Sequence, residues 1–196
     1  MRILIAEDEP LVAEGLRSRL EGLGHQVVAI AYDGSEAVAK AGTTSPDLIF
    51  MDIKMPRLEG IEAAERIMAN RPVPIIVLTA HMDPHLIERA MAVGVMGYLV
   101  KPVDRRDLLP AITLAATRFA DLMGLRKDVQ SLKEALVLRQ QVERAKGILA
   151  QRLGLPEAKA HLRLQQIAQR ERCTLGQAAD RVIAADKFFT NIDETE

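Results

Sequence analysis

Five polar side chains suited to phosphoryl transfer follow short apolar runs in this chain. They are Glu7, Asp8, Asp52, Thr79 and Lys101. If the fold gathers them, three carboxylates, a hydroxyl and an ammonium share one site, and the carboxylates repel one another unless a cation neutralises them. Mg²⁺ suits such a site because it prefers oxygen ligands and keeps several waters. One carboxylate could then attack phosphorus and become an aspartyl phosphate, while the metal and the ammonium neutralise the phosphoryl oxygens.

A parallel sheet would gather these side chains. The apolar runs cover residues 3–6, 27–30, 48–51, 75–78 and 97–100. Each run is too short for a helix and too apolar for a strand with one face in water, which is typical of buried parallel strands. Helical patterns alternate with them near residues 10–23, 34–42, 58–70, 84–93 and from 104 onward. We therefore predict an α/β fold with a doubly wound, flavodoxin-like sheet of five parallel strands, which binds ligands beyond the carboxyl ends of its strands.

Taken singly, these residues have plainer interpretations. Glu7 and Asp8 could be acids at the start of a helix, and Thr79 could be an ordinary β-branched residue at a strand end. Tyr98, in the fifth run, could be half-buried packing. Because these residues occur together at the ends of the predicted strands, a shared phosphoryl-transfer site is favoured over these separate interpretations.

Four segments of the first part of the chain carry a family resemblance. They read ILIAEDEP, LIFMDIKMPRLEG, IIVLTA and GYLVKP. By these segments, residues 1–121 resemble the receiver domain of two-component response regulators. The resemblance implies a phosphorylated regulator with a histidine kinase as partner, and not an enzyme. The alternative is a phosphatase of the haloacid dehalogenase type, but that class typically has a DxD motif after its first strand, where this chain has Glu7-Asp8-Glu9.

The resemblance also implies a role for each site residue. Asp52 would be phosphorylated, and Mg²⁺ would be held by Asp8, Asp52 and the backbone carbonyl of Lys54, with Glu7 in support. Thr79 and Tyr98 would form a switch pair. Lys101 would hold the phosphoryl group, and the Lys101–Pro102 peptide would be cis.

Composition places the chain among reduced, water-soluble proteins. It has one cysteine, so neither a disulfide framework nor a cysteine zinc site is expected. The N-terminus lacks the apolar run of a signal peptide, and no uninterrupted 18-residue apolar run occurs, so we expect a cytoplasmic protein without a membrane segment. Residues 1–121 are acidic whereas residues 138–187 are basic, which suggests two functions.

A long helix is predicted from Asp104 to about Leu153. Within the linker 122–137, apolar residues step by four and three positions, at Leu125, Val129, Leu132 and Leu136. This is the pattern of a short coiled coil, so we expect a homodimer through this helix. The alternative is that the same residues pack against their own chain.

The last part of the chain resembles a second family. The stretches VERAKGILAQRLGLPEAKAHLRLQQIA and TLGQAADRVI are similar to the ANTAR domain, the RNA-binding module of antitermination regulators. This implies a three-helix domain over residues 138–187 that binds stem-loop RNA for transcription antitermination, followed by a flexible tail over 188–196. Gly154 and Pro156 separate its first two helices, the second of which spans about 157–171. Thr174 would cap a last helix from 175 to about 186.

Candidate RNA contacts are the basic residues of this domain and one histidine. They are Lys146, His161, Arg163, Arg170 and Arg181. The family usually has an aromatic residue at the position of His161, an arginine at Gln165 and a methionine at Gln169. The two helices after Pro156 could instead form a DNA-binding helix-turn-helix, or a protein-interaction module. The turn at 171–174 lacks the glycine common in helix-turn-helix motifs.

Overall fold

The computed structural model describes the backbone of residues 1–80 and 84–193, and the side chains of residues 1–80 and 84–187. The described part of the chain divides into two compact units, Met1–Gly124 and Leu125–Glu196, which are called the first and the second unit below. The predicted linker, residues 122–137, contains this boundary. A long helix, α5 (Arg105–Leu153), begins in the first unit and ends in the second, as the sequence predicted.

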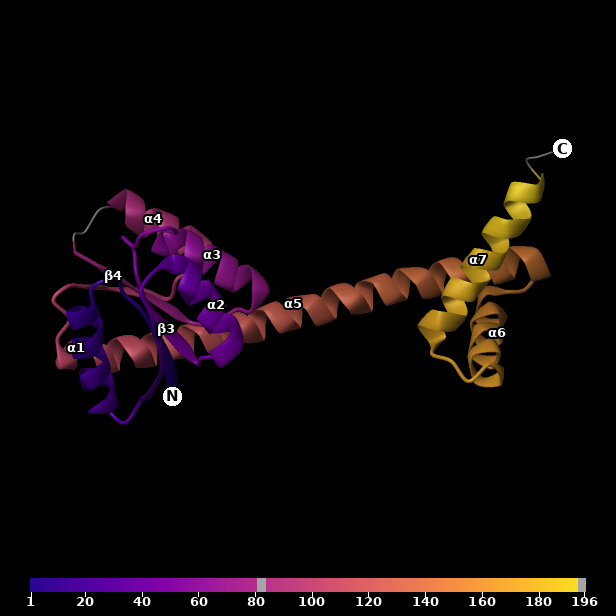
Figure 1. Ribbon diagram of the computed structural model, residues 1–196. Helices are drawn as coiled ribbons and strands as arrows, with labels where there is room; N and C mark the ends of the chain where they lie inside the picture. The colour runs from indigo at the N-terminus through magenta and orange to yellow at the C-terminus, as the bar shows by residue number, and fades with distance from the viewer. Residues whose placement is uncertain (81–83, 194–196) are drawn as a thin grey trace. The chain divides into compact units, whose positions relative to one another are not determined.

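The first unit is built on a parallel sheet (Figure 1). Within the described residues, its strands are β1 (Arg2–Ala6), β2 (Gln26–Ala31), β3 (Leu48–Asp52), β4 (Ile75–Thr79) and β5 (Gly97–Val100). They lie in the order β2-β1-β3-β4-β5, and every neighbouring pair is parallel. The predicted fold is therefore confirmed.

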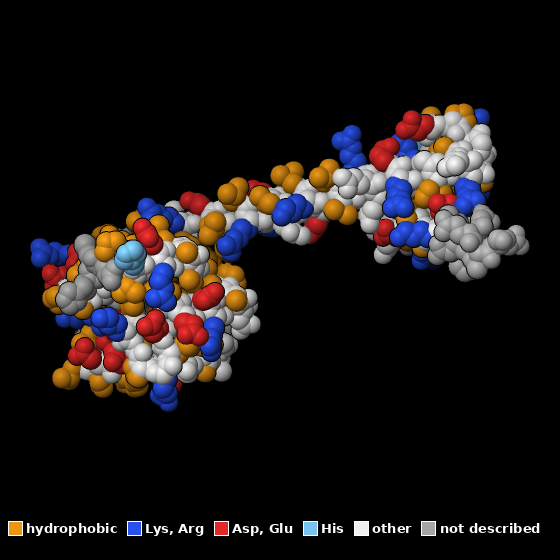
Figure 2. Space-filling model, turned by 90° about the horizontal axis from the view of Figure 1, so that it is seen from above, with side chains coloured by type: hydrophobic (Ala, Val, Ile, Leu, Met, Phe, Trp, Pro, Cys, Tyr) orange, Lys and Arg blue, Asp and Glu red, His pale blue; other side chains and the backbone are white. Residues whose placement is uncertain are grey.

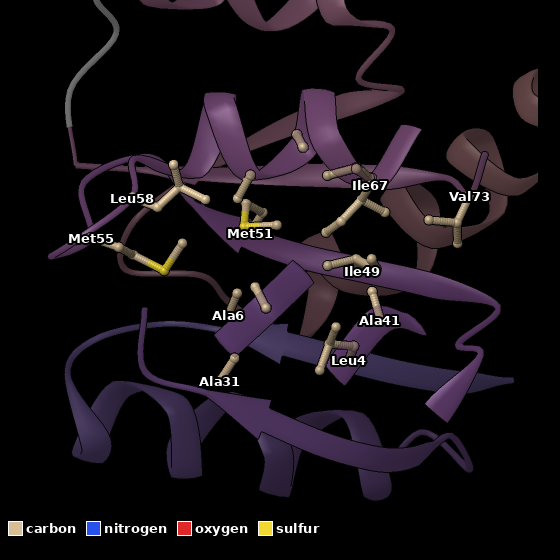
Figure 3. Packing of buried hydrophobic residues seen from close by; sticks show 14 residues of the cluster. Leu4, Ala6, Ala31, Ala41, Ile49, Met51, Met55, Leu58, Ile67 and Val73 are labelled. Carbon is tan, nitrogen blue, oxygen red and sulfur yellow. The ribbon is translucent and has the colours of Figure 1, made fainter. Parts of the chain in front are cut away.

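Helices cover both faces of this sheet. They are α1 (Pro10–Glu21), α2 (Gly34–Thr44), α3 (Gly60–Asn70), α4 (Pro84–Val93) and the start of α5. Leu4, Ile49 and Met51 point to one face and pack against α2 and α3 (Figure 3). Alternate residues such as Phe50 point to the other face and pack against α1 and α5. The central strands β1, β3 and β4 are buried on both faces and are apolar almost throughout, which is why the sequence identified them clearly. The prediction that no strand has a face in water is wrong for the edge strand β5, where Tyr98 and Val100 are exposed.

The second unit packs the end of α5 against α6 (Glu157–Arg170) and α7 (Leu175–Asp193). Gly154, with φ of 61°, ends α5 as predicted. Thr174 caps α7: its Oγ accepts from the Gln177 N–H, and the Gln177 side chain accepts from the Thr174 N–H. The core contains mainly small and aliphatic side chains: Val142, Ala145, Leu149, Ala160, Leu164, Ala168, Ala178 and Ala179.

The end of the last helix is a correction to the sequence prediction. The sequence predicted that α7 ends near residue 186, before a flexible tail over 188–196, but the helix continues to Asp193. No glycine or proline follows Gly176, and Ala184 and Ala185 favour helix, so nothing in the chain ends it earlier. Residues 194–196 of the predicted tail lie outside the described residues.

The predicted apolar seam of α5 is exposed. Leu125, Val129, Leu132 and Leu136 have 63%, 44%, 69% and 57% of their surface accessible. Figure 2 shows hydrophobic side chains on the surface along this stretch of the helix. These residues belong to none of the buried cores of the two units, so their apolar side chains are open to a partner helix.

One helix among the described residues meets the length and composition of a membrane span. It is α5, in which an 18-residue window has a mean hydropathy of 1.3. The sequence prediction counted only uninterrupted apolar runs, whereas this average admits charged residues. A single such helix is weak evidence for a membrane. Leu108, Ile112 and Ala115 of α5 are buried in the core of the first unit. Packing in this core therefore explains part of the apolar character of α5.

Candidate functional site

The carboxyl ends of β1, β3 and β5 bring three acids and one cation together. Oxygens of Glu7, Asp8 and Asp52 lie within 4.8 Å of one another. The ammonium of Lys101 lies 2.6 Å from Glu7 Oε2 and 3.0 Å from Asp52 Oδ2. The Lys101–Pro102 peptide is cis, as expected from the resemblance. The structure therefore gathers these four side chains at one edge of the sheet.

These groups differ in their access to solvent. Glu7 is fully buried and Asp52 nearly so, whereas Asp8 is the most exposed of the three acids. A pocket of about 590 Å³ opens above them, and Asp52 and Lys101 both line it. The remaining lining residues are Asp8, Glu9, Ile53, Lys54, Thr79, Ala80 and Leu86. A phosphoryl donor can therefore approach Asp52 from solvent, whereas Glu7 lies beneath the surface.

Burial dominates the protonation of the two inner acids. Burial raises the pKa of Glu7, and the Lys101 ammonium only partly offsets this effect. Burial likewise raises the pKa of Asp52, with a smaller contribution from the negative charge of Asp8. Burial lowers the pKa of Lys101, but its hydrogen bonds to Glu7 and Asp52 outweigh burial and raise it. The site therefore combines three carboxyl groups with one ammonium, and its two inner acids ionise less readily than free side chains.

This electrostatic imbalance predicts a pH dependence. Because its pKa is raised in the folded protein, Glu7 binds more protons there than in the unfolded chain at pH values just above the ordinary glutamate pKa. The free energy of unfolding should therefore fall, relative to that of Glu7→Gln, as the pH rises through this interval. Urea unfolding of both metal-free proteins from acidic to neutral pH measures the difference, and a constant difference would contradict the prediction.

The site fits a hard divalent cation. Its donors are carboxylate oxygens, which Mg²⁺ prefers. Glu7 Oε2 is buried and makes no hydrogen bond of normal geometry, although the Lys101 ammonium lies close to it. A cation bound among the three acids, or one of its waters, would give this oxygen a partner. Lys54 lines the pocket, and the role of its carbonyl as a ligand stays a prediction.

The exposed acid offers a clean test of the metal site. Asp8→Asn should weaken Mg²⁺ binding at least about tenfold, because loss of a direct ligand should cost no less than loss of an outer partner. It should also raise the free energy of unfolding of the metal-free protein, by about 1 kcal/mol at low ionic strength, because a repelling charge is removed. Calorimetric Mg²⁺ titration and urea unfolding measure the two effects, and Asp104→Asn, outside the pocket, is the control. A strongly destabilised metal-free variant would make Asp8 a structural residue instead.

Two close backbone contacts hold the loop that follows Asp52. A Cβ on Gly60 would lie 1.8 Å from the carbonyl oxygen of Asp52, and one on Gly34 would lie 2.3 Å from that of Leu58. The Gly60 N–H donates to the Ile53 carbonyl at 2.8 Å. The sequence analysis missed these contacts, although Gly60 ends the LIFMDIKMPRLEG segment.

An ion pair ties the same loop to the start of α2. Asp33 is fully buried, accepts from the Glu36 N–H at 2.8 Å as the cap of α2, and pairs with Arg57. Arg57 lies in the loop and has φ of 64°. The sequence analysis did not identify this ion pair.

Thr79 and Tyr98 line one cavity of about 220 Å³ between α4, β4, β5 and α5. Thr79 is buried at the end of β4, and Tyr98 on β5 is 44% exposed. Leu114 and Arg118 of α5 line the same cavity. This cavity therefore places Thr79, at the end of β4, and Tyr98 next to the same side chains of α4 and α5.

The candidate RNA contacts of the second unit differ in exposure and in whether an acid already pairs with them. Lys146 has 13% of its side chain exposed and pairs with Glu143 at 2.8 Å and Glu157 at 3.2 Å. Arg181 pairs with Glu171. His161 is half-buried, whereas Arg163 and Arg170 are exposed.

Comparison with known families divides the chain at the same place. The family described as response regulator receiver domain matches residues 3–113, and the family described as ANTAR domain matches residues 130–183. The two matches fall on either side of the boundary at residue 124 between the compact units.

Individual relatives share this arrangement in whole or in part. The transcriptional regulatory protein PdtaR of Mycobacterium tuberculosis is 45% identical over 93% of this chain and 89% of its own length. The transcriptional regulatory protein YxjL of Bacillus subtilis, described as uncharacterized, is 38% identical over 59% of this chain and 54% of its own length. Among solved structures, the receiver domain of a modulated diguanylate cyclase from Desulfovibrio desulfuricans is 38% identical and covers 61% of this chain and 95% of its own, with a TM-score of 0.57. The response regulator domain of Thermotoga maritima CheB is 30% identical and covers 60% of this chain and 96% of its own, with a TM-score of 0.56.

Proposed function

Because this chain belongs to the response regulators that join a receiver domain to an ANTAR domain, we propose that a histidine kinase phosphorylates it on Asp52. We further propose that it controls gene expression by binding stem-loop RNA for transcription antitermination. The first step is supported by the position of Asp52, which lines an open pocket 3.0 Å from Lys101 and beside two further carboxylates. The second step rests on the ANTAR match over residues 130–183.

Phosphorylation would use the side chains of the pocket directly. An Asp52 carboxylate oxygen attacks phosphorus, and the bond from phosphorus to the kinase histidine breaks, so the electron pair leaves with the imidazole. Asp8, Asp52 and the Lys54 carbonyl would hold Mg²⁺ with Glu7 in support. When bound, the metal supplies positive charge to the phosphoryl oxygens. The Lys101 ammonium, now beside Asp52, would pair with another phosphoryl oxygen.

The signal would then spread through the cavity beside Thr79. If the Thr79 hydroxyl turns toward the phosphoryl group, the space next to it changes, and Tyr98 on the same cavity can move inward. This movement alters the surface formed by α4, β5 and α5. The protein would thus shift between two populations of states, and the phosphoryl group would favour one of them.

RNA binding tests the output directly. A hairpin RNA and a DNA duplex with the sequence of its stem are compared by gel shift across a salt series, with and without acetyl phosphate and Mg²⁺. We expect the hairpin to bind more tightly, and phosphorylation to change its affinity. Preferential binding of the duplex would favour the DNA-binding alternative, and binding of neither would favour a protein-interaction module.

The exposed seam of α5 supports a homodimer. In a coiled coil, Leu132 would face the partner helix, so Leu132→Asp would bury an unpaired carboxylate and should convert the dimer to a monomer. Light scattering with and without phosphorylation measures the mass. Ser131→Asp adds the same charge beside the seam and should leave the dimer intact. If the unmodified protein is a monomer in both states, the dimer model is wrong.

We propose that the protein acts in the cytoplasm, as a regulator without enzymatic turnover and without a membrane. The support is the similarity to response regulators over both units and the use of apolar α5 residues in the core of the first unit. A cell-fractionation experiment with the full chain tests the location.

A further inference from the structure

The outer face of α6 carries cations and no acid. Lys159, Arg163 and Arg170 are exposed, and their spacing of four and seven residues places them on one side of the helix. With a rise of 1.5 Å per residue, the row extends over roughly 16 Å. The side chains between them on this face, Leu162 and Gln166, are uncharged. No acid therefore interrupts this row of positive charges.

The acids closest in sequence to this row are already paired. Glu157, the one acidic residue of α6, lies 3.2 Å from Lys146 of α5. Glu171, just beyond the helix, pairs with Arg181 of α7. Within the described side chains, Lys159, Arg163 and Arg170 form no ion pair, and Arg163 only donates to the Gln166 side chain at 3.3 Å. Their charges therefore remain available to a ligand.

Among the side chains that the structure describes, the other two helices of the second unit offer no comparable row. On α5, Glu143 lies between Arg139 and Arg144 in the sequence. On α7, acidic and basic residues adjoin each other, as in the pairs Asp180-Arg181 and Asp186-Lys187. A polyanion would therefore meet a row of like charges on α6 and mixed charges on the other two helices.

Two cations suggested by the sequence have structural roles instead. Lys146 is mostly covered, pairs with Glu143 of its own helix and joins α5 to the first turn of α6 through Glu157. Using it for a phosphate would break both ion pairs. Arg181 likewise links α7 to the end of α6. Lys146 and Arg181 thus position α6.

We propose that the phosphates of RNA bind along Lys159, Arg163 and Arg170 on the outer face of α6. The proposal rests on the proposed RNA-binding function and adds where, and with which residues, the RNA is held. The two guanidinium groups can each make paired hydrogen bonds to a phosphate, and Lys159 adds a point charge. A row of this length touches backbone rather than base edges, so it provides affinity and orientation more than sequence specificity.

A matched pair of double variants tests the proposal in the full chain. Arg163→Gln/Arg170→Gln removes two charges from the row, and Arg139→Gln/Arg144→Gln removes two from α5. The probe is the hairpin RNA described above, and the readout is the slope of log affinity against log salt concentration. The α6 variant should lower the magnitude of the slope by about 1.5 and weaken binding about tenfold or more, whereas the α5 variant should match wild type.

Further variants separate folding from binding. Arg163→Lys/Arg170→Lys keeps both charges and should retain most of the salt slope. Lys159→Gln, added to the α6 double variant, should lower the slope further by about 0.7–0.9. Circular dichroism checks that all variants remain helical, as expected for exposed positions.

The remaining outcomes overturn the proposal or its premise. Equal losses of RNA affinity and salt slope in the α5 and α6 double variants would show that net charge, not the α6 row, governs binding. An equal effect on the DNA duplex would show a general polyanion surface rather than an RNA site. If wild type does not bind the hairpin in either phosphorylation state, the proposed function itself fails, which is distinct from normal binding that the α6 variants leave unchanged.

Discussion

Asp52→Asn should abolish the incorporation of phosphate from acetyl phosphate in the presence of Mg²⁺. The amide keeps the size of the side chain but cannot attack phosphorus as a carboxylate does. In the structure, Asp52 is the buried acid that also lines the open pocket, since Glu7 is fully buried beneath it and Lys101 separates the two. The variant should fold, because burial raises the pKa of Asp52 and its charge therefore costs stability in the metal-free protein.

The measurement is phosphate labelling of the intact protein, followed by mass analysis of the labelled peptide. Asp104→Asn, an exposed acid outside the pocket, serves as the control and should be labelled like wild type. Asp8→Asn should be labelled slowly because it retains the nucleophile and loses a metal ligand. Undiminished labelling of Asp52→Asn would place the nucleophile on another residue and remove the central observation of the proposed function.

Gly60→Ala should lower the free energy of unfolding of the first unit by about 3 kcal/mol. The new Cβ would lie 1.8 Å from the carbonyl oxygen of Asp52. To relieve this clash, the backbone at residue 60 or at Asp52 must move. For a unit of this size, such a loss corresponds to a fall in Tm of roughly 10–15 °C. The displacement would also shift Asp52 itself, so phosphorylation should slow in protein that remains folded.

A second glycine provides the control for this substitution. Gly42 lies within α2 of the same unit, and a Cβ there would meet no atom within 4 Å. Gly42→Ala should therefore stabilise the helix by about 0.5–1 kcal/mol, because alanine loses less backbone entropy. Differential scanning calorimetry of both variants gives the comparison. Equal Tm values for Gly60→Ala and wild type would show that the loop after Asp52 adapts to a side chain at residue 60.

The sequence alone was enough to predict the sheet and the acidic cluster. The central strands β1, β3 and β4 are buried on both faces, so each appears as an uninterrupted apolar run that no amphipathic helix would show. Parallel strands all end at one edge, so residues that follow different runs, such as Asp8 and Asp52, must meet there. Local signals also placed the helix boundaries at Gly154 and Thr174, since backbone conformation and capping depend only on neighbouring residues.

Only the tertiary structure showed which charged side chains are free to bind a ligand and which backbone segments are in contact. From the sequence, Lys146 and Arg163 are equivalent cations on helices, but Lys146 is held by Glu157 from another helix while Arg163 faces solvent. Likewise, the contact of Gly60 with the Asp52 carbonyl depends on tenths of an ångström between two backbone segments. Pairing and close packing are set by the distances between atoms of different elements, and these distances are fixed only when the elements pack, so residue type and spacing do not contain them.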